Sequence, residues 1–179
     1  MDILESERIK LRALETSDID ILFEWENDPD LWLISNTISP FSRFIIKKYI
    51  QNSHLDIYQT KQLRLMIDLK KQGKNETIGT IDLFDFDPYH SRAGIGILIK
   101  EVKNRSKGYA SEALKLIIDY CFNSLRLHQL YCNIPSDNTS SLNLFRKHGF
   151  TVVGEKKEWL RTGDHWINEY LLQRISDSS

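Results

Sequence analysis

Apolar residues recur with two different periods along this chain, and the changes of period predict where strands give way to helices. The run Gly-Ile-Gly-Ile-Leu-Ile at 94–99 is rich in β-branched residues, which is typical of a buried strand. Between residues 110 and 125 the apolar side chains instead return every three or four positions, along one face of a helix. The middle of the chain therefore predicts a strand, a short basic loop and a long amphipathic helix.

The same two periods predict the elements on either side. Strands are expected at 8–14, 63–67, 77–86, 91–99, 129–134, 151–160 and 165–173, and helices from Ile19 to Trp25, within 41–59 and over 138–148. Thr16–Asp18 offers an N-cap for the first helix, and Gly149 stands after the last one, where left-handed backbone often closes a helix. The order predicts an α/β (α+β) fold with one mixed sheet and helices on both faces.

Length and composition limit the classes of protein to consider. A chain of 179 residues has the size of one domain, expected to span 1–175 with a short polar tail at 176–179. The net charge of -1 gives no support to nucleic acid as a partner. No segment approaches the ~20 apolar residues of a membrane helix, and the N-terminus lacks a signal-peptide pattern. We therefore expect a cytoplasmic protein with no membrane partner.

The positions of cysteine and histidine favour neither a disulfide nor a metal site. Cys121 falls on the apolar face of the long helix and Cys132 in the following strand, so both are expected to be buried structural thiols. The five histidines are scattered without the spacing of metal ligands, and we predict no metal.

The loop Arg105-Ser106-Lys107-Gly108-Tyr109-Ala110 carries the clearest chemical signal. It joins the buried strand to the amphipathic helix, so free backbone N–H groups and the positive end of the helix dipole meet at one exposed point, which suits a phosphate. The alternative is an ordinary turn that starts the helix. Neither the dinucleotide fingerprint nor the Walker pattern is present, which excludes a Rossmann or P-loop assignment.

This loop also resembles a known family signature. Arg105-x-x-Gly108-x-Ala110 is similar to the R/Q-x-x-G-x-G/A pattern of the GNAT acyltransferases, and the neighbouring segments fit in order. The strand at 94–99 resembles the splayed fourth strand of that superfamily, and 137–150 resembles its D-N-x-x-S/A…R-x-x-G-F segment. The opening at 9–14 resembles the branch that acetylates ribosomal-protein N-termini and polyamines. The resemblance implies a mostly antiparallel sheet whose strands 4 and 5 splay apart.

The resemblance implies acetyl-CoA as the acyl donor. Its pyrophosphate would bind backbone N–H groups at 106–110, its pantetheine would lie along 97–99, and Asn138 would hydrogen-bond the pantetheine arm. The residues expected to bind the cofactor are Ile97, Leu98, Ile99, Arg105, Ser106, Lys107, Gly108, Tyr109, Ala110, Asn138, Phe145 and Arg146. Lys103 and Lys147 are further candidates for the outer phosphates, although any of these basic side chains could instead be a solvated surface charge.

Acetyl transfer to an amine needs a base, an oxyanion donor and a route for the leaving thiolate. An alkylammonium of pKa about 10.4 must lose a proton before it attacks, and a backbone N–H at or near Leu98 could donate to the thioester oxygen. In the polyamine branch a tyrosine protonates the thiolate, but Phe145 takes that position here. Water could donate, the thiolate could leave unprotonated, or Ser141 could substitute, unless Ser141 is only a helix cap. Tyr131 and Tyr109 are weaker substitutes.

Several carboxylates could act as the base. Asp82, Asp85 and Asp87 lie on or just after the strand at 77–86, where alternation sends Asp82 and Asp85 to opposite faces unless a bulge intervenes. Asp82 has apolar sequence neighbours and is the first choice, whereas Asp87 fits a turn. Glu155 and Glu158 are alternatives, and each acid could equally be a solvated or structurally paired carboxylate.

The resemblance also implies on which side the acceptor binds, because in this superfamily the region between the first two helices and the last hairpin frame the acceptor. Aromatic rings with carboxylates suit a cationic amine, unless the tryptophans simply fill the core. The expected acceptor-binding residues are Trp25, Glu26, Trp32, Asp82 and Asp85, with Trp159 and Trp166 framing the same side.

The leading hypothesis is an acetyl-CoA-dependent N-acetyltransferase in which a primary amine attacks directly in a ternary complex. The carboxylates favour a polyamine such as spermidine as acceptor, whereas Ser141 together with Phe145 favours a protein N-terminus. The alternatives are an aminoglycoside-type amine as acceptor and a non-catalytic acyl-CoA sensor. The apolar strands are compatible with a homo-oligomer.

Overall fold

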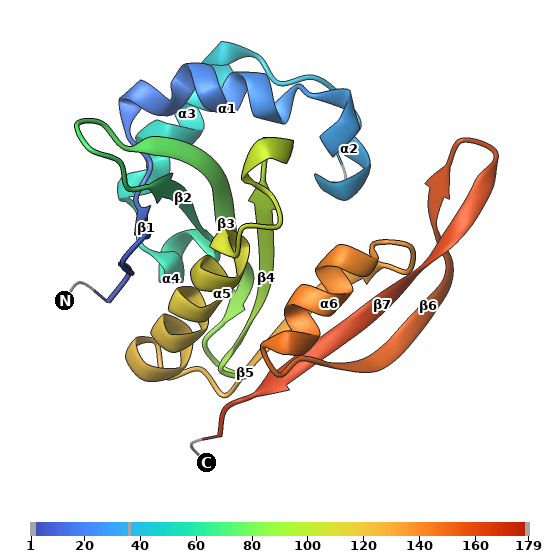
Figure 1. Ribbon diagram of the computed structural model, residues 1–179. Coiled ribbons are helices and arrows are strands. Elements are labelled where there is room, and N and C mark those ends of the chain that lie inside the picture. The colour runs from blue at the N-terminus through green and yellow to red at the C-terminus, as the bar shows by residue number, and fades with distance from the viewer. Residues whose placement is uncertain (1–2, 36, 178–179) are drawn as a thin grey trace.

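A seven-stranded sheet organises the computed structural model, which describes residues 3–35 and 37–177. The strands lie in the order β1-β2-β3-β4-β5-β7-β6, and every neighbouring pair is antiparallel except β4 and β5 (Figure 1). Their bounds are β1 Ile9–Arg12, β2 Leu63–Leu69, β3 Glu76–Asp87, β4 Arg92–Ile99, β5 Gln129–Pro135, β6 Thr151–Thr162 and β7 His165–Ile175.

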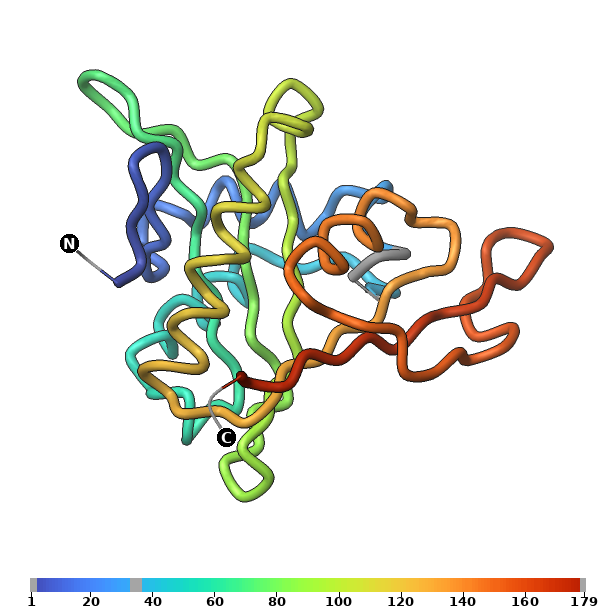
Figure 2. The backbone as a smooth tube through the Cα atoms, turned by 60° about the horizontal axis from the view of Figure 1, so that its bottom comes forward, coloured from blue at the N-terminus to red at the C-terminus, as the bar shows by residue number. Residues whose placement is uncertain are grey.

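Helices cover both faces of the sheet, as the sequence predicts. Figure 2 shows α5 on one side of the sheet with the N-terminal helices behind it, while the β6–β7 hairpin projects away from the body. The helices are α1 Ile19–Glu26, α2 Pro29–Ser35, α3 Arg43–Gln51, α4 Ile57–Thr60, α5 Tyr109–Asp119 and α6 Thr139–Lys147. The predicted order of strands and helices is confirmed. Two further short helices, α2 and α4, were not predicted from the apolar pattern.

Side-chain alternation along β2 divides the core in two. Leu65 and Ile67 point into the larger core under α5 and α6, whereas Met66 between them packs with α1 and α3. Cys121 and Cys132 lie buried in the larger core as free thiols, which confirms the expectation from the sequence. Among the described residues, no helix is long and apolar enough to cross a membrane.

The sheet splits between β4 and β5. These strands pair only through Arg92–Gly94 and Gln129–Tyr131. Beyond Gly94 and Tyr131, β4 and β5 are not paired with each other. The ring of Phe84 occupies the space that a side chain on Gly94 would fill, which explains the glycine where the split begins. The expected splaying of strands 4 and 5 is thus confirmed.

The first helix starts differently from the prediction. Thr16–Asp18 forms a 3-10 turn, and the Asp18 side chain makes no capping hydrogen bond to α1. Asp18 is instead buried, where it accepts hydrogen bonds from Arg12 at 2.8 and 2.9 Å and from the backbone N–H of Glu15 at 2.8 Å. Gly149, by contrast, adopts the expected left-handed conformation after α6, with φ +81°.

Candidate active site

A tightly curled loop joins β4 to α5. Ser106 and Gly108 have φ values of +57° and +88°, in the left-handed region that glycine tolerates best. Arg105 holds the start of the loop by donating from Nε to the carbonyl of Ile99 at 3.0 Å and from Nη2 to that of Lys100 at 2.9 Å. Gly108 is the N-cap of α5, so the first N–H groups of the helix, which have no partner within the helix, lie beside the loop. This geometry suits a phosphate.

Arg8 also shapes this loop, although the sequence did not single it out. Its Nη1 donates to the carbonyl of Lys107 at 3.1 Å, it pairs with Glu112, and its guanidinium lies 4.9 Å from the ring centre of Tyr109. Arg8 lies 99 positions before Lys107 in the sequence, so no local sequence pattern could have predicted this contact. Because Arg105 is bound to backbone carbonyls, its role here is to fix the loop.

The other basic side chains expected near the outer phosphates lie on the surface. Lys107, Arg146 and Lys147 are exposed, and Lys103 lies 3.6 Å from Glu76. These four cations remain available to an anionic ligand, because surface ion pairs are weak and screened.

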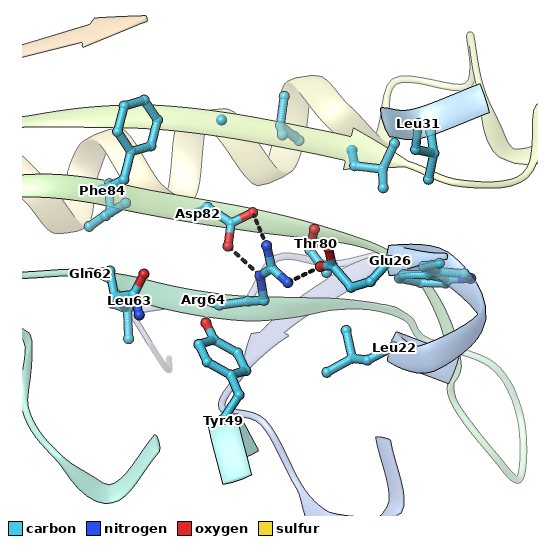
Figure 3. A pocket seen from close by; sticks show the side chains of 15 residues that line it. Leu22, Glu26, Leu31, Tyr49, Gln62, Leu63, Arg64, Thr80, Asp82 and Phe84 are labelled. Atoms are coloured by element: carbon cyan, nitrogen blue, oxygen red, sulfur yellow. Dashed lines mark hydrogen bonds and ion pairs between the residues drawn. The ribbon is translucent and has the colours of Figure 1, made fainter. Parts of the chain in front are cut away.

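A cavity of about 290 Å³, which we call the carboxylate cavity, lies between α1, α2 and the strands β2–β4. Arg64 of β2 occupies its centre (Figure 3). Its Nε lies 2.5 Å from Oδ1 of Asp82, its Nη2 lies 3.5 Å from Oδ2, and its Nη1 pairs with Glu26. The ring of Tyr49 lies 5.7 Å from this guanidinium. The predicted base and the predicted acceptor carboxylate are therefore brought together by an arginine that the sequence did not single out.

Burial raises the pKa of Asp82 above its usual value, and the Glu26 carboxylate adds to the rise while Arg64 opposes it. Because Arg64 is shared with Glu26, its single positive charge does not offset both carboxylates. Burial lowers the pKa of Arg64, but the two carboxylates outweigh that effect and keep the guanidinium charged. The cavity thus contains a carboxyl group whose proton affinity is increased, which is a property of general bases.

The other residues predicted for the acceptor side separate. Trp25 lines the carboxylate cavity, and Trp32 supports it from outside by donating from Nε1 to the carbonyl of Glu26 at 3.0 Å. Asp85 lies instead in a different cavity, where it accepts a hydrogen bond from Tyr131 at 3.1 Å. A register shift between Phe84 and Asp87 in β3 displaces it, with φ +48° at Asp85. Asp85 therefore does not line the carboxylate cavity with Asp82, although both were expected to bind the acceptor.

The alternative bases also lie away from the carboxylate cavity. Asp87 pairs with Arg92 at 3.3 Å, and the backbone N–H of His90 lowers its pKa. Glu155 binds Lys157 at 2.6 Å and Asn168 at 2.7 Å on the exposed hairpin. Of the carboxylates considered from the sequence as bases, Asp82 alone lines this cavity among the described residues.

A second cavity of about 420 Å³, which we call the split cavity, occupies the gap between β4 and β5. It shares Phe84, Gly96 and Ile97 with the carboxylate cavity, so the two are adjacent across β4. From α6 it is lined by Asn138, Ser141 and Phe145. The cavity beside α6 and the cavity that holds Asp82 therefore lie next to each other.

Two of the residues at α6 that line the split cavity have structural contacts of their own. Asn138 Oδ1 accepts from the backbone N–H of Ser141 at 3.1 Å, which caps the helix. Phe145 is 3% exposed and packs edge to face on Phe150 with ring centres 5.1 Å apart. The position thus contributes apolar packing and no dissociable proton.

The hairpin contributes a charged pair that the sequence did not single out. Lys156 of β6 pairs with Glu169 of β7, donates to Asn133 Oδ1 at 3.0 Å, and lies 4.8 Å from the ring centre of Trp159. A lysine and a glutamate on the two strands of one predicted hairpin could have indicated this ion pair. However, a register shift between Lys156 and Leu160 means that counting back from the turn does not place Lys156 opposite Glu169.

Comparisons with known proteins agree with this geometry. A family model for the acetyltransferase (GNAT) domain matches residues 8–151. The uncharacterized N-acetyltransferase p20 of Bacillus licheniformis is 29% identical over 98% of this chain and 97% of its own length. Spermidine N(1)-acetyltransferase of Escherichia coli (strain K12) is 28% identical over 82% of this chain and 75% of its own.

Solved structures share the fold. The crystal structure of spermidine N-acetyltransferase from Vibrio cholerae, in complex with CoA and spermine, matches with a TM-score of 0.81 and 21% identity, covering 95% of this chain and 96% of that one. An acetyltransferase of the same family from Bacillus anthracis matches with a TM-score of 0.76 and 24% identity over 96% and 97% of the two chains.

Proposed function

The chain belongs to the GNAT acetyltransferase family and is an acyltransferase, and from that premise we propose that it transfers the acetyl group of acetyl-CoA to a primary amine, with a polyamine as the favoured acceptor. One observation carries this proposal: the split cavity, beside α6, shares Phe84, Gly96 and Ile97 with the carboxylate cavity, which holds Asp82. A donor bound on one side of the sheet and an amine bound on the other would meet at β4.

The residues around the split suit acetyl-CoA. The N–H groups at 106–110, beside the left-handed Gly108, would hold the pyrophosphate, and the edge of β4 at Ile97–Ile99 would pair with the pantetheine. Asn138 and Phe145 would line the opposite side of the pantetheine arm. When bound, acetyl-CoA supplies the thioester that reacts.

The carboxylate cavity provides what the amine requires. Asp82 would accept the proton that an ammonium must lose before it attacks, and its raised pKa makes it a stronger base than an ordinary aspartate. Arg64 holds that carboxylate in place while also binding Glu26. A backbone N–H at or near Leu98 would polarise the thioester carbonyl.

A cationic acceptor is favoured by the charges and by the relatives. Asp82 and Glu26 against Arg64 leave one net negative charge in the carboxylate cavity, and Trp25 adds an aromatic wall. Relatives named spermidine N-acetyltransferases have similar sequences. A protein N-terminus is the second candidate, because Phe145 replaces the tyrosine typical of the polyamine branch. A Vibrio cholerae spermidine N-acetyltransferase structure is described as dodecameric, which supports a homo-oligomer here.

The proposal is tested by binding and by an acceptor screen. Acetyl-CoA should raise the melting temperature, and spermidine, spermine and peptides beginning with alanine or serine should then be compared as acceptors. Acetylation of spermidine or spermine well above the peptides supports the favoured acceptor, while the reverse order replaces it with a protein N-terminus. CoA binding without turnover of any amine would leave an acyl-CoA sensor, and no stabilisation at saturating acetyl-CoA would overturn the proposal.

A further inference from the structure

Lys156 is the one cationic side chain, among the residues that the structure describes, that lines the split cavity. It starts from β6 and crosses β7, where it pairs with Glu169, to reach Asn133 on β5. Asn133 comes two residues after Tyr131, at which the pairing of β4 with β5 ends. The ammonium therefore lies near the closed end of the split, where β4 and β5 begin to diverge.

Three contacts fix the position of this ammonium. The Glu169 carboxylate, whose side chain is 9% exposed, pairs with it, Asn133 Oδ1 accepts from it at 3.0 Å, and the ring of Trp159 lies 4.8 Å away. A lysine side chain normally loses considerable rotamer entropy when it is held in one place. Here the folded hairpin has already ordered it, so a ligand in the split meets a pre-organised positive charge.

Phe145 leaves a chemical task open in this cavity. Its ring has no proton for a departing thiolate, and the hydroxyl of Ser141 is a neutral donor. Hydrogen bonds from a charged donor are about twice as strong as those between neutral groups. Lys156 is therefore better suited than Ser141 to receive negative charge on sulfur.

Resting on the proposed function, we propose that Lys156 is a catalytic residue that stabilises the thiolate of CoA as it leaves. The amine nitrogen forms a bond to the acetyl carbonyl carbon, the carbon–sulfur bond breaks, and sulfur keeps the electron pair. Asp82 first releases to solvent the proton that it took from the ammonium, and then accepts the second proton, which the nitrogen loses as the amide forms. Nζ of Lys156 donates a hydrogen bond to the thiolate, and no proton is transferred from nitrogen to sulfur in this step.

The pKa of the CoA thiol in the complex tests this role without depending on the acceptor. The pH titration follows the ultraviolet absorbance of the thiolate in the CoA complex, and a parallel titration with desulfo-CoA removes the signal of the tyrosines. Burial raises the pKa of Cys121 and of Cys132 to about 12, so the protein thiols stay silent below about pH 10. Lys156→Met removes the charge, and Lys156→Arg keeps it.

Lys157→Met is the matched control. Lys157 is the next residue of β6, and it pairs with Glu155 on the exposed hairpin and does not line the split cavity. It therefore removes a lysine of the same strand from outside the proposed site.

In the wild type and in Lys157→Met, the bound thiol should titrate about one unit below its usual value of about 8.5. Lys156→Met should raise that pKa by about one unit and lower kcat about tenfold with little change in the KM for acetyl-CoA, and Lys156→Arg should restore most of both. An unchanged thiol pKa in a Lys156→Met variant that still binds CoA would overturn the role of Lys156 alone. Failure of the wild type to bind CoA would overturn the proposed function as well.

Discussion

Nε of Arg64 lies 2.5 Å from Oδ1 of Asp82, and the same guanidinium also pairs with Glu26. One positive charge therefore serves two carboxylates, so neither carboxylate is fully compensated. In the proposed function, the remaining negative charge would attract a cationic amine, and Asp82, which pairs with Gly96 of β4, would accept its proton. The same three side chains would then serve both the attraction and the activation of the amine.

Replacement of Asp82 should identify the base. Asp82→Asn is expected to lower kcat/KM by about 10²–10⁴, the usual contribution of general acid–base catalysis. Because burial raises the pKa of Asp82, the wild-type kcat/KM should fall on acidification with an apparent pKa above the usual value of about 3.9, since a protonated Asp82 accepts no proton. This acidic limb should be missing from Asp82→Asn.

Asp87→Asn is the control for that profile, because Asp87 lies on the same strand, pairs with Arg92 and has a lowered pKa. It should retain both the rate and the acidic limb. An acidic limb that persists in Asp82→Asn would assign the base to another group.

Gly108→Glu should abolish cofactor binding. It adds a carboxylate at the N-terminus of α5, where phosphate is expected, and its Cβ would lie 3.1 Å from Nη2 of Arg8. Gly73→Glu is a matched control, because Gly73 has φ +92°, close to the +88° of Gly108, and open space around it. Both variants share the backbone strain of a non-glycine residue at positive φ, roughly 1–2 kcal/mol.

Thermal melting with and without acetyl-CoA separates the two glycine variants. Gly73→Glu should keep the full shift, which is about 2.7 kcal/mol of added stability at a ligand concentration of 100 Kd. Gly108→Glu should show no shift. Equal shifts in the two variants would place the pyrophosphate elsewhere.

Asp18 should stabilise the fold in a pH-dependent way. Burial alone raises its pKa, but Arg12 and the backbone N–H of Glu15 more than offset this, and the pKa lies below its usual value of 3.8. A lowered carboxyl pKa gives stability that is fully present above the unfolded pKa and is lost as pH falls through the folded pKa. Asp18→Asn should therefore lower the free energy of unfolding by about 1–3 kcal/mol at pH 7.

The difference between Asp18→Asn and the wild type should shrink below about pH 3.8, where the wild-type carboxyl group becomes protonated in the unfolded chain and then in the folded one. Urea titrations at several pH values measure this. A difference that stays constant with pH would mean that the Arg12 pair does not carry the effect.

Gly79 should be required for the packing of β3 against β4. A Cβ at this position would overlap the backbone carbonyl oxygen of Leu98, which cannot move without disturbing the strand pair. Gly79→Ala should therefore cost about 1–3 kcal/mol in unfolding free energy. At Gly96 a Cβ would lie at an ordinary 3.9 Å from Phe84, so Gly96→Ala should be far less destabilising in the same denaturant titration.

The order of strands and helices and the position of the loop at 105–110 could be predicted because their signals are local, whereas the split between β4 and β5 was expected from the family resemblance. Strand periodicity, the glycine at 108 and the helix that follows lie within a few consecutive residues. The charged group around Arg64 could not be predicted in this way. Asp82 and Glu26 were expected at the site, but Arg64 is separated from Glu26 by 38 positions and from Asp82 by 18, and alone it looks like a solvated surface charge.

Register shifts account for the remaining differences. The bulge between Phe84 and Asp87 moves Asp85 into a different cavity, and the shift after Lys156 obscures its alignment with Glu169. A bulge inserts an extra residue without a reliable sequence mark, so the positions beyond it cannot be assigned to a face by counting. Which side chains lie together at such positions can be determined only from the pairing of the strands in the structure.

The split in the sheet also affects how the protein responds to its ligand. Three residue pairs join β4 to β5, so the sheet itself is continuous between β1–β4 and β5–β7 only at Arg92–Gly94 and Gln129–Tyr131. A pantetheine chain lying along the edge of β4 would form hydrogen bonds with backbone groups that do not pair with β5, and would bridge the two strands. Amide hydrogen exchange at Ile97–Ile99 should therefore slow when acetyl-CoA binds, while the far end of the β6–β7 hairpin exchanges as before. The acetyl donor would then stabilise the sheet at the split as well as take part in the reaction.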